Sequence, residues 1–394
     1  MNEQMEESEA SILHTYNRFP VVFEKGDGCY LYDSEGKEYL DFAAGIAVNA
    51  LGYHYPGYDE ALKSQIDKLM HISNLYYNEP IIEAGAKLVQ ASHMEKAFFT
   101  NSGTEAIEGA LKAAKKYAYE RDGHADHEII AMNHSFHGRS IGALSVTGTA
   151  HYREPFEPLM GGVKFADFND LESVKAQITD KTCAIITEVV QGEGGIYPAK
   201  KEFLEGLRQI CDEKDIMLIF DEIQCGMGRT GHYFAWQAYG VQPDIMTSAK
   251  ALGCGVPVGA FVLSEKAAKA SLEPGDHGTT YGGNPFVCAA VSKVFDIYEN
   301  DKIIEHVQEM TPYLEQKLDE IVAKHECAAT RRGMGFMQGI VIQGRPVGEV
   351  VKAALAKGLL VISAGSDVLR IVSPLVITKE HIDKMAAILD ECME

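Results

Sequence analysis

The sequence predicts an α/β protein with a mostly parallel central sheet in a large domain and a smaller α+β domain. From about residue 79 to residue 295, short apolar runs alternate with segments of helical spacing, a pattern typical of strand–helix–strand units. After residue 287, two helical stretches precede apolar runs at 358–362 and 368–372. The 394 residues suffice for about two or three domains.

The domains and elements are expected in a definite order. Residues 1–55 form an N-terminal segment that contributes to the small domain, residues 56–286 the large domain, and residues 287–394 the C-terminal small α+β domain. Short strands and turns are expected within 21–48 and a helix within 58–70. The glycine-rich stretch 274–285 predicts a long loop. Strands of the large domain are expected at 97–100, 128–132, 183–190, 217–220, 245–247 and 259–263.

Charge and cysteine usage exclude some classes of protein. The formal net charge of −21 argues against a nucleic-acid or anionic-membrane partner. Eight cysteines are scattered without a Cys-x-x-Cys pair, which favours reduced thiols, and we predict no metal centre. No apolar run reaches about 18 residues, and the polar N-terminus is unlike a signal peptide. We therefore expect a cytoplasmic protein.

Lys250 and Asp221 each follow an apolar run and point to cofactor chemistry. Lys250 lies among small, weakly polar neighbours, where burial would favour a neutral, nucleophilic amine. Asp221 ends the apolar run 217–220, twenty-nine residues upstream. A lysine that forms a Schiff base and a carboxylate for the pyridine nitrogen are what pyridoxal phosphate requires.

A candidate phosphate site follows the expected strand 97–100. Ser102, Gly103 and Thr104 stand between that strand and an amphipathic run, so their N–H groups and the helix dipole could bind an anion. The same residues also fit an ordinary helix cap, because Ser-x-x-Glu is a capping pattern.

Four further segments could contribute side chains to a site. Phe136 could stack on a flat ring and Arg139 could bind a carboxylate, unless they form a surface turn. Glu193 would face a cleft from its glycine-rich loop or be solvated. The loop 277–285 supplies hydroxyls for a second phosphate contact. Arg370 in an expected strand needs an anion, whether a ligand or a protein carboxylate.

Two rival interpretations come from other classes of protein. Residues 226–231 match Gly-x-Gly-x-x-Gly and would suit a nicotinamide-dependent dehydrogenase. Five residues separate Gly226 from Phe220, however, so the tight strand-to-helix turn of that motif is missing. A non-catalytic binding protein is the second rival, and the presence of the lysine, the aspartate and both arginines argues against it.

In this order, the segments resemble the class III (omega-amino) aminotransferases, a pyridoxal-phosphate family with fold type I of the PLP-dependent transferases. The resemblance covers nearly the whole chain. Within the family, residues 16–20, 45–49 and 73–77 are similar to the branch that acts on acetylornithine. The most specific matches are 101–105, 136–139, 191–195, 221–230, Lys250 and 277–285, and the departures are Ile107, Val189, Val190, Ala251 and Cys254.

The resemblance implies a role for each site residue. Lys250 would form the Schiff base and shuttle the proton, and Asp221 would pair with the pyridine nitrogen. Arg139 would hold the carboxylate of the acylated ornithine. The cofactor would also contact Ser102, Gly103, Thr104, Phe136, Glu222, Ile223, Gln224 and, from the other subunit, Thr280.

The resemblance also implies how two different substrates share one pocket. Arg370 would hold the α-carboxylate of glutamate or 2-oxoglutarate, and Thr279 would touch substrate. Glu193 would pair with Arg370 while the ω-amino donor is bound and release it for the dicarboxylate. Such a pair hides the arginine charge when it is unwanted.

The implied reaction is a two-step transamination in a homodimer with shared active sites. The δ-amino group of N2-acetyl-L-ornithine would pass to 2-oxoglutarate, as in arginine biosynthesis. Succinylornithine, succinyl-diaminopimelate, ornithine and 4-aminobutyrate stay open as alternative donors. Residues 41–46 lack the tyrosine that ornithine enzymes of the family carry, which counts against free ornithine. Arg139 favours a donor with a distal carboxylate but does not separate acetyl from succinyl.

Overall fold

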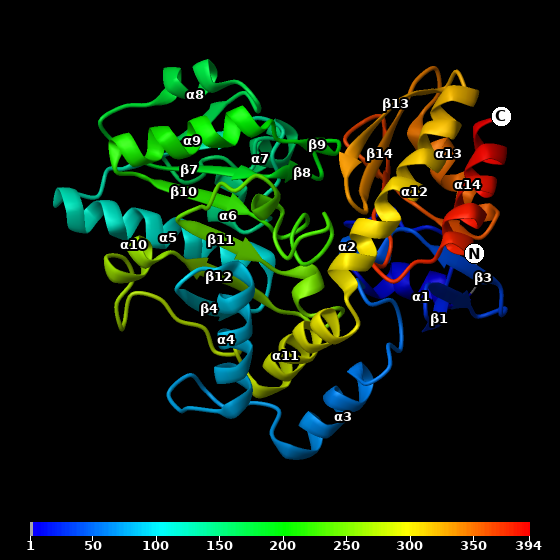
Figure 1. The fold of residues 1–394 in the computed structure, drawn as a ribbon, viewed down its shortest axis with the longest axis horizontal. Helices are drawn as coiled ribbons and strands as arrows, with labels where there is room; N and C mark the ends of the chain where they lie inside the picture. Colours follow the sequence, from blue (N-terminus) through cyan, green and yellow to red (C-terminus); the bar gives the residue numbers. More distant parts are fainter. Residues whose placement is uncertain (1–2) are drawn as a thin grey trace.

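A computed structural model describes residues 3–394 and contains a central seven-stranded sheet (Figure 1). Five neighbouring strands are parallel, and β12 runs antiparallel to both β11 and β4. The predicted mostly parallel sheet is therefore confirmed. In spatial order the strands are β4 (Lys96–Thr100), β12 (Gly259–Leu263), β11 (Ile245–Ser248), β10 (Met217–Asp221), β7 (Thr182–Glu188), β5 (Glu128–Met132) and β6 (Val163–Ala166).

Helices cover both faces of this sheet. In β5, Ile129 and Ala131 pack in the apolar cluster of α5 (Gly103–Asp122), whereas Ile130 and Met132 pack in the cluster of α9 (Lys201–Lys214). This alternation is the two-residue period of a strand buried on both faces. The other elements of this part are α4 (Glu79–Ser92), α6 (Ile141–Ser145), α7 (Ala150–Arg153), η1 (Glu154–Phe156), α8 (Leu171–Gln177), β8 (Val190–Gln191), β9 (Tyr197–Pro198), η2 (Ala235–Ala238), η3 (Lys250–Leu252) and α10 (Glu265–Lys269).

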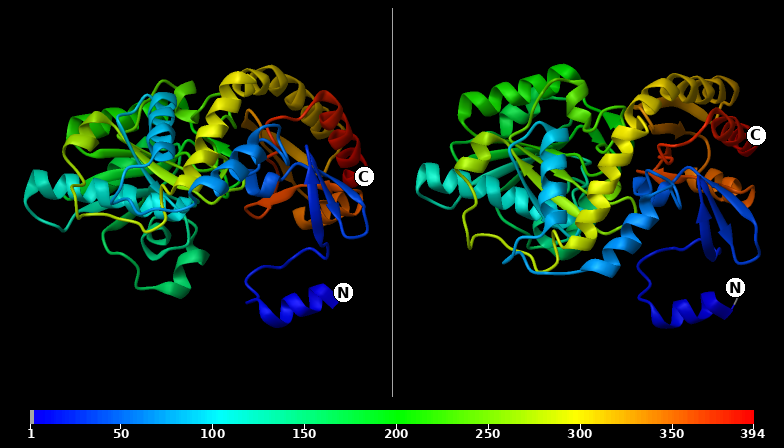
Figure 2. Two further views of the ribbon diagram at one scale, coloured as in Figure 1. Left: turned by 90° about the horizontal axis from the view of Figure 1, so that it is seen from below. Right: turned by 60° about the horizontal axis from the view of Figure 1, so that its bottom comes forward.

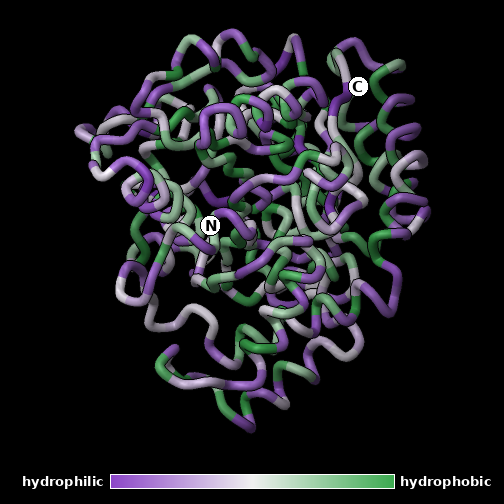
Figure 3. The backbone as a smooth tube through the Cα atoms, turned by 60° about the vertical axis from the view of Figure 1, so that its left-hand side comes forward, coloured by the Kyte–Doolittle hydropathy of each residue, from purple (hydrophilic) through white to green (hydrophobic). Residues whose placement is uncertain are grey.

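The C-terminal part of the chain forms a second α+β layer, at the right of Figure 1. Its helices are amphipathic: along α14, Ile382, Met385 and Leu389 are buried at helical spacing. Figure 3 shows the same alternation of hydrophobic and hydrophilic residues along the peripheral helices. The elements are α12 (Ile303–Lys324), α13 (Val347–Ala356), α14 (Lys379–Met393) and the antiparallel strands β13 (Ala328–Met334), β14 (Met337–Ile342), β17 (Val368–Ile371) and β16 (Ile362–Ala364).

The N-terminal strands lie beside this C-terminal part (Figure 2). β15 (Leu359–Leu360) pairs in parallel with β3 (Glu38–Asp41). Across the same sheet, β3 is followed by β2 (Tyr30–Asp33) and then by β1 (Phe23–Asp27) at the edge. The division of the chain at residues 55/56 and 286/287 stays a prediction. The remaining helices are α1 (Glu3–Ser11), which stands away from the body, α2 (Ala44–Ala47), α3 (Tyr58–Lys68) and α11 (Pro285–Asn300).

None of the helices in residues 3–394 combines the length and the apolar character that crossing a bilayer requires.

Candidate active site

The chemistry-bearing residues gather where the parallel strands end. Asp221 is the last residue of β10, Glu188 the last of β7, and Lys250 follows β11 after one residue. A cavity of about 490 Å³ opens at this edge, the place where open α/β sheets bind ligands. It is lined by Val48, Asn101, Ser102, Gly103, Thr104, Phe136, His137, Gly138, Arg139, Glu188, Val190, Asp221, Ile223, Gln224, Cys225, Ala249, Lys250, Gly255, Val256, Pro257 and Val258.

Lys250 lies in this cavity with a free amine. Its backbone has a φ of 45°, a left-handed conformation that costs energy for a residue with a side chain. Burial lowers the pKa of the Lys250 amine, although the negative charges of Glu193 and Asp221 oppose that shift. Within residues 3–394 the amine makes no hydrogen bond or ion pair. A lysine in this state is suited to act as a nucleophile or a base.

Asp221 is buried and held from two sides. Its Oδ2 lies 2.7 Å from His137 Nδ1, while Oδ1 accepts hydrogen bonds from the Ile223 N–H at 3.0 Å and the Thr247 hydroxyl at 3.2 Å. Burial lowers the pKa of His137, but Asp221 and Glu188 outweigh it, so that pKa is raised. The Nε2 atom of His137 is buried and has no partner among the described residues. The carboxylate is therefore fixed in orientation.

The start of α5 satisfies both interpretations of its sequence. Ser102 is the N-cap, and its hydroxyl accepts from the Glu105 N–H at 3.3 Å, so the capping pattern is real. The N–H groups of Gly103 and Thr104 in the first turn have no intrahelical acceptor, and both residues line the cavity. The positive end of a 20-residue helix therefore faces the cavity. The lack of a side chain at Gly103 lets the turn pack closely on Ile223, since a Cβ would lie 2.9 Å from Ile223 Cδ1.

Glu193 and Arg370 form an ion pair beside the cavity. Arg370 Nη1 lies 2.5 Å from Glu193 Oε1 and Nη2 lies 3.3 Å from Oε2. Gln224, which lines the cavity, accepts from Arg370 Nη1 at 3.0 Å. Arg370 is 3% exposed and its Nε has no partner within residues 3–394. Although burial acts in the opposite direction, Arg370 lowers the pKa of Glu193, so the pair is charged.

Phe136 and Arg139 occupy another wall of the cavity. The guanidinium carbon of Arg139 lies 5.4 Å from the centre of the Phe136 ring and 4.0 Å from that of Tyr152. In the described part of the chain, no carboxylate forms an ion pair with Arg139. Its charge is therefore available to a ligand.

Five predicted site residues do not line the cavity of their own chain: Glu193 and Arg370, described above, and Glu222, Thr279 and Thr280. The Glu222 carboxylate accepts hydrogen bonds from the N–H groups of Ala235 and Trp236, both at 2.8 Å. The hydroxyl of Thr279 accepts from the Asn101 amide at 3.2 Å, which places it just behind the cavity wall. Thr280 is exposed. The contact of Thr280 with a second subunit stays a prediction.

Two buried residues of the site, His137 and Glu188, lie within the segments 136–139 and 183–190 named from the sequence but were given no role there. His137 contacts Asp221, as described above. Glu188 accepts from the N–H groups of Phe136 at 3.2 Å and Gly192 at 3.1 Å, and burial raises its pKa to about 7. A polar residue at the end of an apolar strand was the available signal for Glu188.

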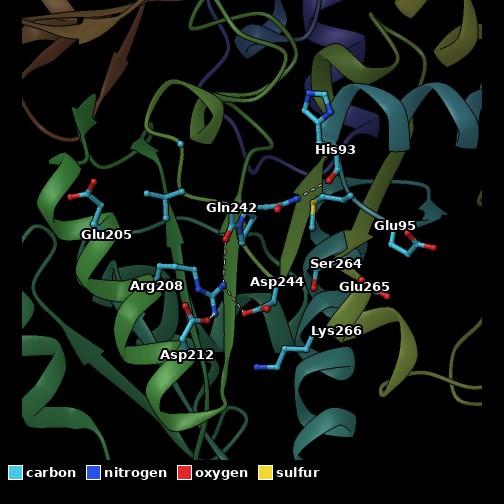
Figure 4. A pocket seen from close by; sticks show the side chains of 14 residues that line it. His93, Glu95, Glu205, Arg208, Asp212, Gln242, Asp244, Ser264, Glu265 and Lys266 are labelled. Atoms are coloured by element: carbon cyan, nitrogen blue, oxygen red, sulfur yellow. Dashed lines mark hydrogen bonds and ion pairs between the residues drawn. The ribbon is translucent and has the colours of Figure 1, made fainter.

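A larger pocket, of about 690 Å³, lies at the opposite edge of the sheet (Figure 4). Asp244, which immediately precedes β11, accepts from the Leu218 N–H at 2.8 Å and lies 2.9 Å from Arg208 Nη1. Arg208 Nη2 is also 2.8 Å from Asp212. Arg208 is thus already neutralised by two carboxylates of the pocket, and the parallel strands β10 and β11 begin rather than end here. Lys250 and Asp221 are not part of this pocket.

One group of potential metal ligands occurs in residues 3–394, formed by Asp122, His124 and His127. Their ligand atoms lie within 4.8 Å of one another. Arg121 Nε and Nη2 each lie 2.6 Å from an Asp122 oxygen, so that carboxylate is already engaged. The group stands at the far end of α5 from Gly103 and takes no part in the cavity.

A free amine, a fixed buried carboxylate and a helix N-terminus thus converge on one cavity, which defines a site for cofactor-dependent chemistry on amines. The aminotransferase class-III family model matches residues 12–393. The chain belongs to this family and is an aminotransferase that depends on pyridoxal phosphate.

Three relatives illustrate the range of the family. The chain is 47% identical to an acetylornithine aminotransferase of Clostridium acetobutylicum, over 98% of this chain and 100% of that one. It is 44% identical to a succinylornithine transaminase of Yersinia pseudotuberculosis, over 94% and 92% of the two chains. A crystal structure of the ornithine aminotransferase of Toxoplasma gondii, with partial occupancy of PLP at its active site, is 28% identical. It has a TM-score of 0.95 and covers 99% of this chain and 93% of that chain.

The residues of the cavity fit this cofactor. The first turn of α5 offers unpaired N–H groups to a phosphate, and the fixed carboxylate of Asp221 suits a protonated pyridine nitrogen. The unpaired amine of Lys250 suits the cofactor aldehyde. Within residues 3–394, no carboxylate binds the N–H groups of Gly103 and Thr104 or the amine of Lys250.

Proposed function

We propose that this chain transfers the δ-amino group of N2-acetyl-L-ornithine to 2-oxoglutarate, giving N-acetyl-L-glutamate 5-semialdehyde and L-glutamate. The observation that supports this most is the pair of arginines with different partners beside one lysine. Arg139 lies against the rings of Phe136 and Tyr152 and forms no ion pair within residues 3–394, whereas Arg370 is paired with Glu193. One arginine is ready for a carboxylate at all times, and the other only when Glu193 leaves.

The chain's own residues bind and orient both substrates. Arg139 holds the α-carboxylate of the acylated donor, at the end of the molecule far from the reacting amine. Arg370 is hidden by Glu193 while this donor is bound, because its reacting end carries no carboxylate. When 2-oxoglutarate enters, Arg370 binds its α-carboxylate and Glu193 turns away. Thr279 adds a substrate contact at the cavity wall.

Bound pyridoxal phosphate supplies the stabilisation of the carbanion. Lys250 carries the proton to and from the carbon that bears the reacting amine, which its lowered pKa permits. Asp221 keeps the pyridine nitrogen protonated, and His137 and Thr247 keep Asp221 in place. Ser102, Gly103 and Thr104 would hold the phosphate, Phe136 and Ile223 would contact the ring, and Gln224 would serve the ring hydroxyl.

We further propose a homodimer in which each site is completed by Thr280 of the second copy. A band of exposed apolar residues follows α3, with Leu75 86% exposed and Tyr77 95% exposed, and patches of this kind mark interfaces. The loop of Thr280 adjoins this band, since the Asn74 amide donates to the Gly282 carbonyl at 2.9 Å. All eight cysteines are free, which supports a reducing, cytoplasmic location.

The donor is tested by the first half of the reaction alone. Holoenzyme is mixed with each amine in the absence of an oxo acid, and the loss of the visible cofactor absorbance is timed. The donors are N-acetylornithine, N-succinylornithine, ornithine and 4-aminobutyrate. We expect N-acetylornithine to react fastest. A faster reaction with N-succinylornithine would move the assignment to that acyl group, and a faster reaction with ornithine or 4-aminobutyrate would refute an acylated donor.

A further inference from the structure

The guanidinium of Arg139 rests on an aromatic surface rather than on a carboxylate. Its carbon lies 4.0 Å from the centre of the Tyr152 ring, closer than to Phe136 at 5.4 Å. Residue 139 is exposed to the cavity, and no ion pair holds it within the described residues. Tyr152 is therefore the nearest group that can restrain this side chain.

Tyr152 itself is held in place by its neighbours. It lies on α7, and its ring meets Phe136 edge-on, with centres 5.9 Å apart and planes at 79°. On its other side the ring of His151 lies 3.9 Å away. The Tyr152 hydroxyl makes no hydrogen bond within residues 3–394. The ring, rather than the hydroxyl, is thus the part that contacts Arg139.

This arrangement prepares Arg139 for a carboxylate. A free arginine side chain loses much rotational freedom when it binds a ligand. Stacking on an aromatic face restrains the guanidinium beforehand and leaves its N–H edge open for two parallel hydrogen bonds to a carboxylate. The restraint benefits only donors that carry such a group at their far end.

We propose that Tyr152 is a positioning residue that holds Arg139 for the distal carboxylate of the donor and so favours donors that carry a carboxylate at the end far from the reacting amine. The proposal rests on the function proposed above. It adds a selectivity element outside the cavity lining, on a helix that contributes no predicted site residue.

The test compares Tyr152→Leu, Tyr152→Phe and Arg139→Ala with two donors. One donor is N-acetylornithine, and the other is N-acetyl-1,4-diaminobutane, which is the same molecule without its carboxylate. Tyr119→Leu is the control, because Lys116 lies 5.8 Å over that exposed ring and residue 119 is about 24 Å along α5 from Gly103. Each variant is first checked for wild-type cofactor absorbance and melting temperature.

We expect Tyr152→Leu to raise the KM for N-acetylornithine about 3- to 30-fold, the range that loss of one cation–π contact gives, with little change in kcat. Its half-reaction rate with N-acetyl-1,4-diaminobutane should equal that of the wild type. Tyr152→Phe keeps the ring and should behave as the wild type with both donors, and Tyr119→Leu should change neither.

Three results would overturn this inference: an unchanged KM in Tyr152→Leu, an equal loss with both donors, or a Tyr152→Phe variant as impaired as Tyr152→Leu. The Arg139→Ala variant distinguishes failure of the role proposed for Tyr152 from failure of the proposed function. If Arg139→Ala raises the KM and Tyr152→Leu does not, only the role of Tyr152 fails. If Arg139→Ala leaves the KM for N-acetylornithine unchanged, the proposed carboxylate site fails as well.

Discussion

At Lys250 the backbone and the side chain are both unusual. The φ of 45° is one that a lysine rarely adopts, and the amine has no partner in the described chain. Stored strain and an unsatisfied amine persist only where the surrounding structure imposes them. The sequence could place Lys250 after a strand, but the backbone conformation depends on the turn between β11 and β12.

The side chains of Asp221 and Glu222 are adjacent in sequence but lie in different surroundings. Both were predicted to contact the cofactor. The backbone continues past the end of β10, where the Glu222 N–H donates to the Thr247 carbonyl, and successive side chains of such an extended chain point to opposite sides. Asp221 therefore reaches the cavity, while Glu222 is directed to the N–H groups of Ala235 and Trp236. The strand period predicts this divergence, whereas the identity of the groups that Glu222 meets depends on a distant loop.

The Glu193–Arg370 pair gives a prediction at the scale of one charge. Glu193→Gln leaves Arg370 unneutralised, so the KM for 2-oxoglutarate should fall and the KM for N-acetylornithine should rise. Each KM should change about tenfold, which corresponds to the free energy of about one hydrogen bond between charged groups. Steady-state kinetics with both substrates measures this. Glu172→Gln, at a glutamate 83% exposed on α8, is the matched control, and parallel changes in both KM values would contradict the proposed switch.

At the scale of elements, the sequence placed most strands of the sheet. β5 and β12 match their predicted ranges, because short apolar runs end at polar or glycine residues. β6 was not predicted, since Val163–Ala166 is a short edge strand interrupted by Lys164. The predicted strand 183–190 divides into β7 and β8. The antiparallel direction of β12 was also missed, although the ten residues that link it to β11 are fewer than a parallel crossover usually needs.

The first turn of α5 gives a prediction about packing. In Gly103→Ala the new Cβ would lie 2.9 Å from Ile223 Cδ1 and 3.1 Å from Ile223 Cγ2, so Ile223, which lines the cavity, must move. We expect the dissociation constant for pyridoxal phosphate to rise about tenfold, in line with the cost of overpacking. Titration of the apoenzyme measures it. Gly348→Ala in the first turn of α13 meets no atom within 4 Å and should bind as the wild type does. Equal affinities for the two variants would rule out this packing argument.

The loop held by Glu222 predicts a pH dependence of stability. Burial raises the pKa of Glu222 from 4.5 to about 7, so its carboxyl stabilises the fold fully below pH 4.5 and loses that effect as the pH rises through 7. The free energy of unfolding should fall by on the order of 3 kcal/mol across this window because of this group.

Glu222→Gln should therefore make the fall in stability between about pH 5 and pH 7.5 less steep, and Glu188, whose pKa is also raised to about 7, accounts for part of the fall that is left. Urea unfolding at several pH values measures the slope for the wild type and the variant. Glu172→Gln, at an exposed position, should follow the wild-type profile. A Glu222→Gln slope that matches the wild type would show that this carboxyl does not titrate in the window.

At the scale of the whole molecule, the composition and motifs predicted the class of fold, because alternating apolar runs and helices specify a layered α/β arrangement. They could not specify how the N-terminal strands join the rest. β3 pairs with β15 across more than 300 residues of chain, and such long-range pairing depends on the assembled structure rather than on local pattern.

The dimer gives a prediction at this scale. Light scattering should give twice the 43.2 kDa mass of the chain, because we expect the exposed apolar band after α3 to be buried in a dimer interface. Leu75→Glu together with Tyr77→Glu should yield monomers with weaker cofactor binding, since Thr280 of the second copy is then lost. Tyr119→Glu should remain dimeric. A monomeric wild type, or a double variant that stays dimeric, would contradict this assembly.

The central claim is that Lys250 is the residue that bonds to the cofactor. Sodium borohydride added to the holoenzyme makes a lysine–cofactor bond permanent, and mass spectrometry of the digested protein then locates it. We predict that the peptide carrying the added mass contains Lys250, and that Lys250→Ala enzyme treated in the same way carries no such mass. Modification at any other lysine of the wild type, or none at all, would contradict the account of this site.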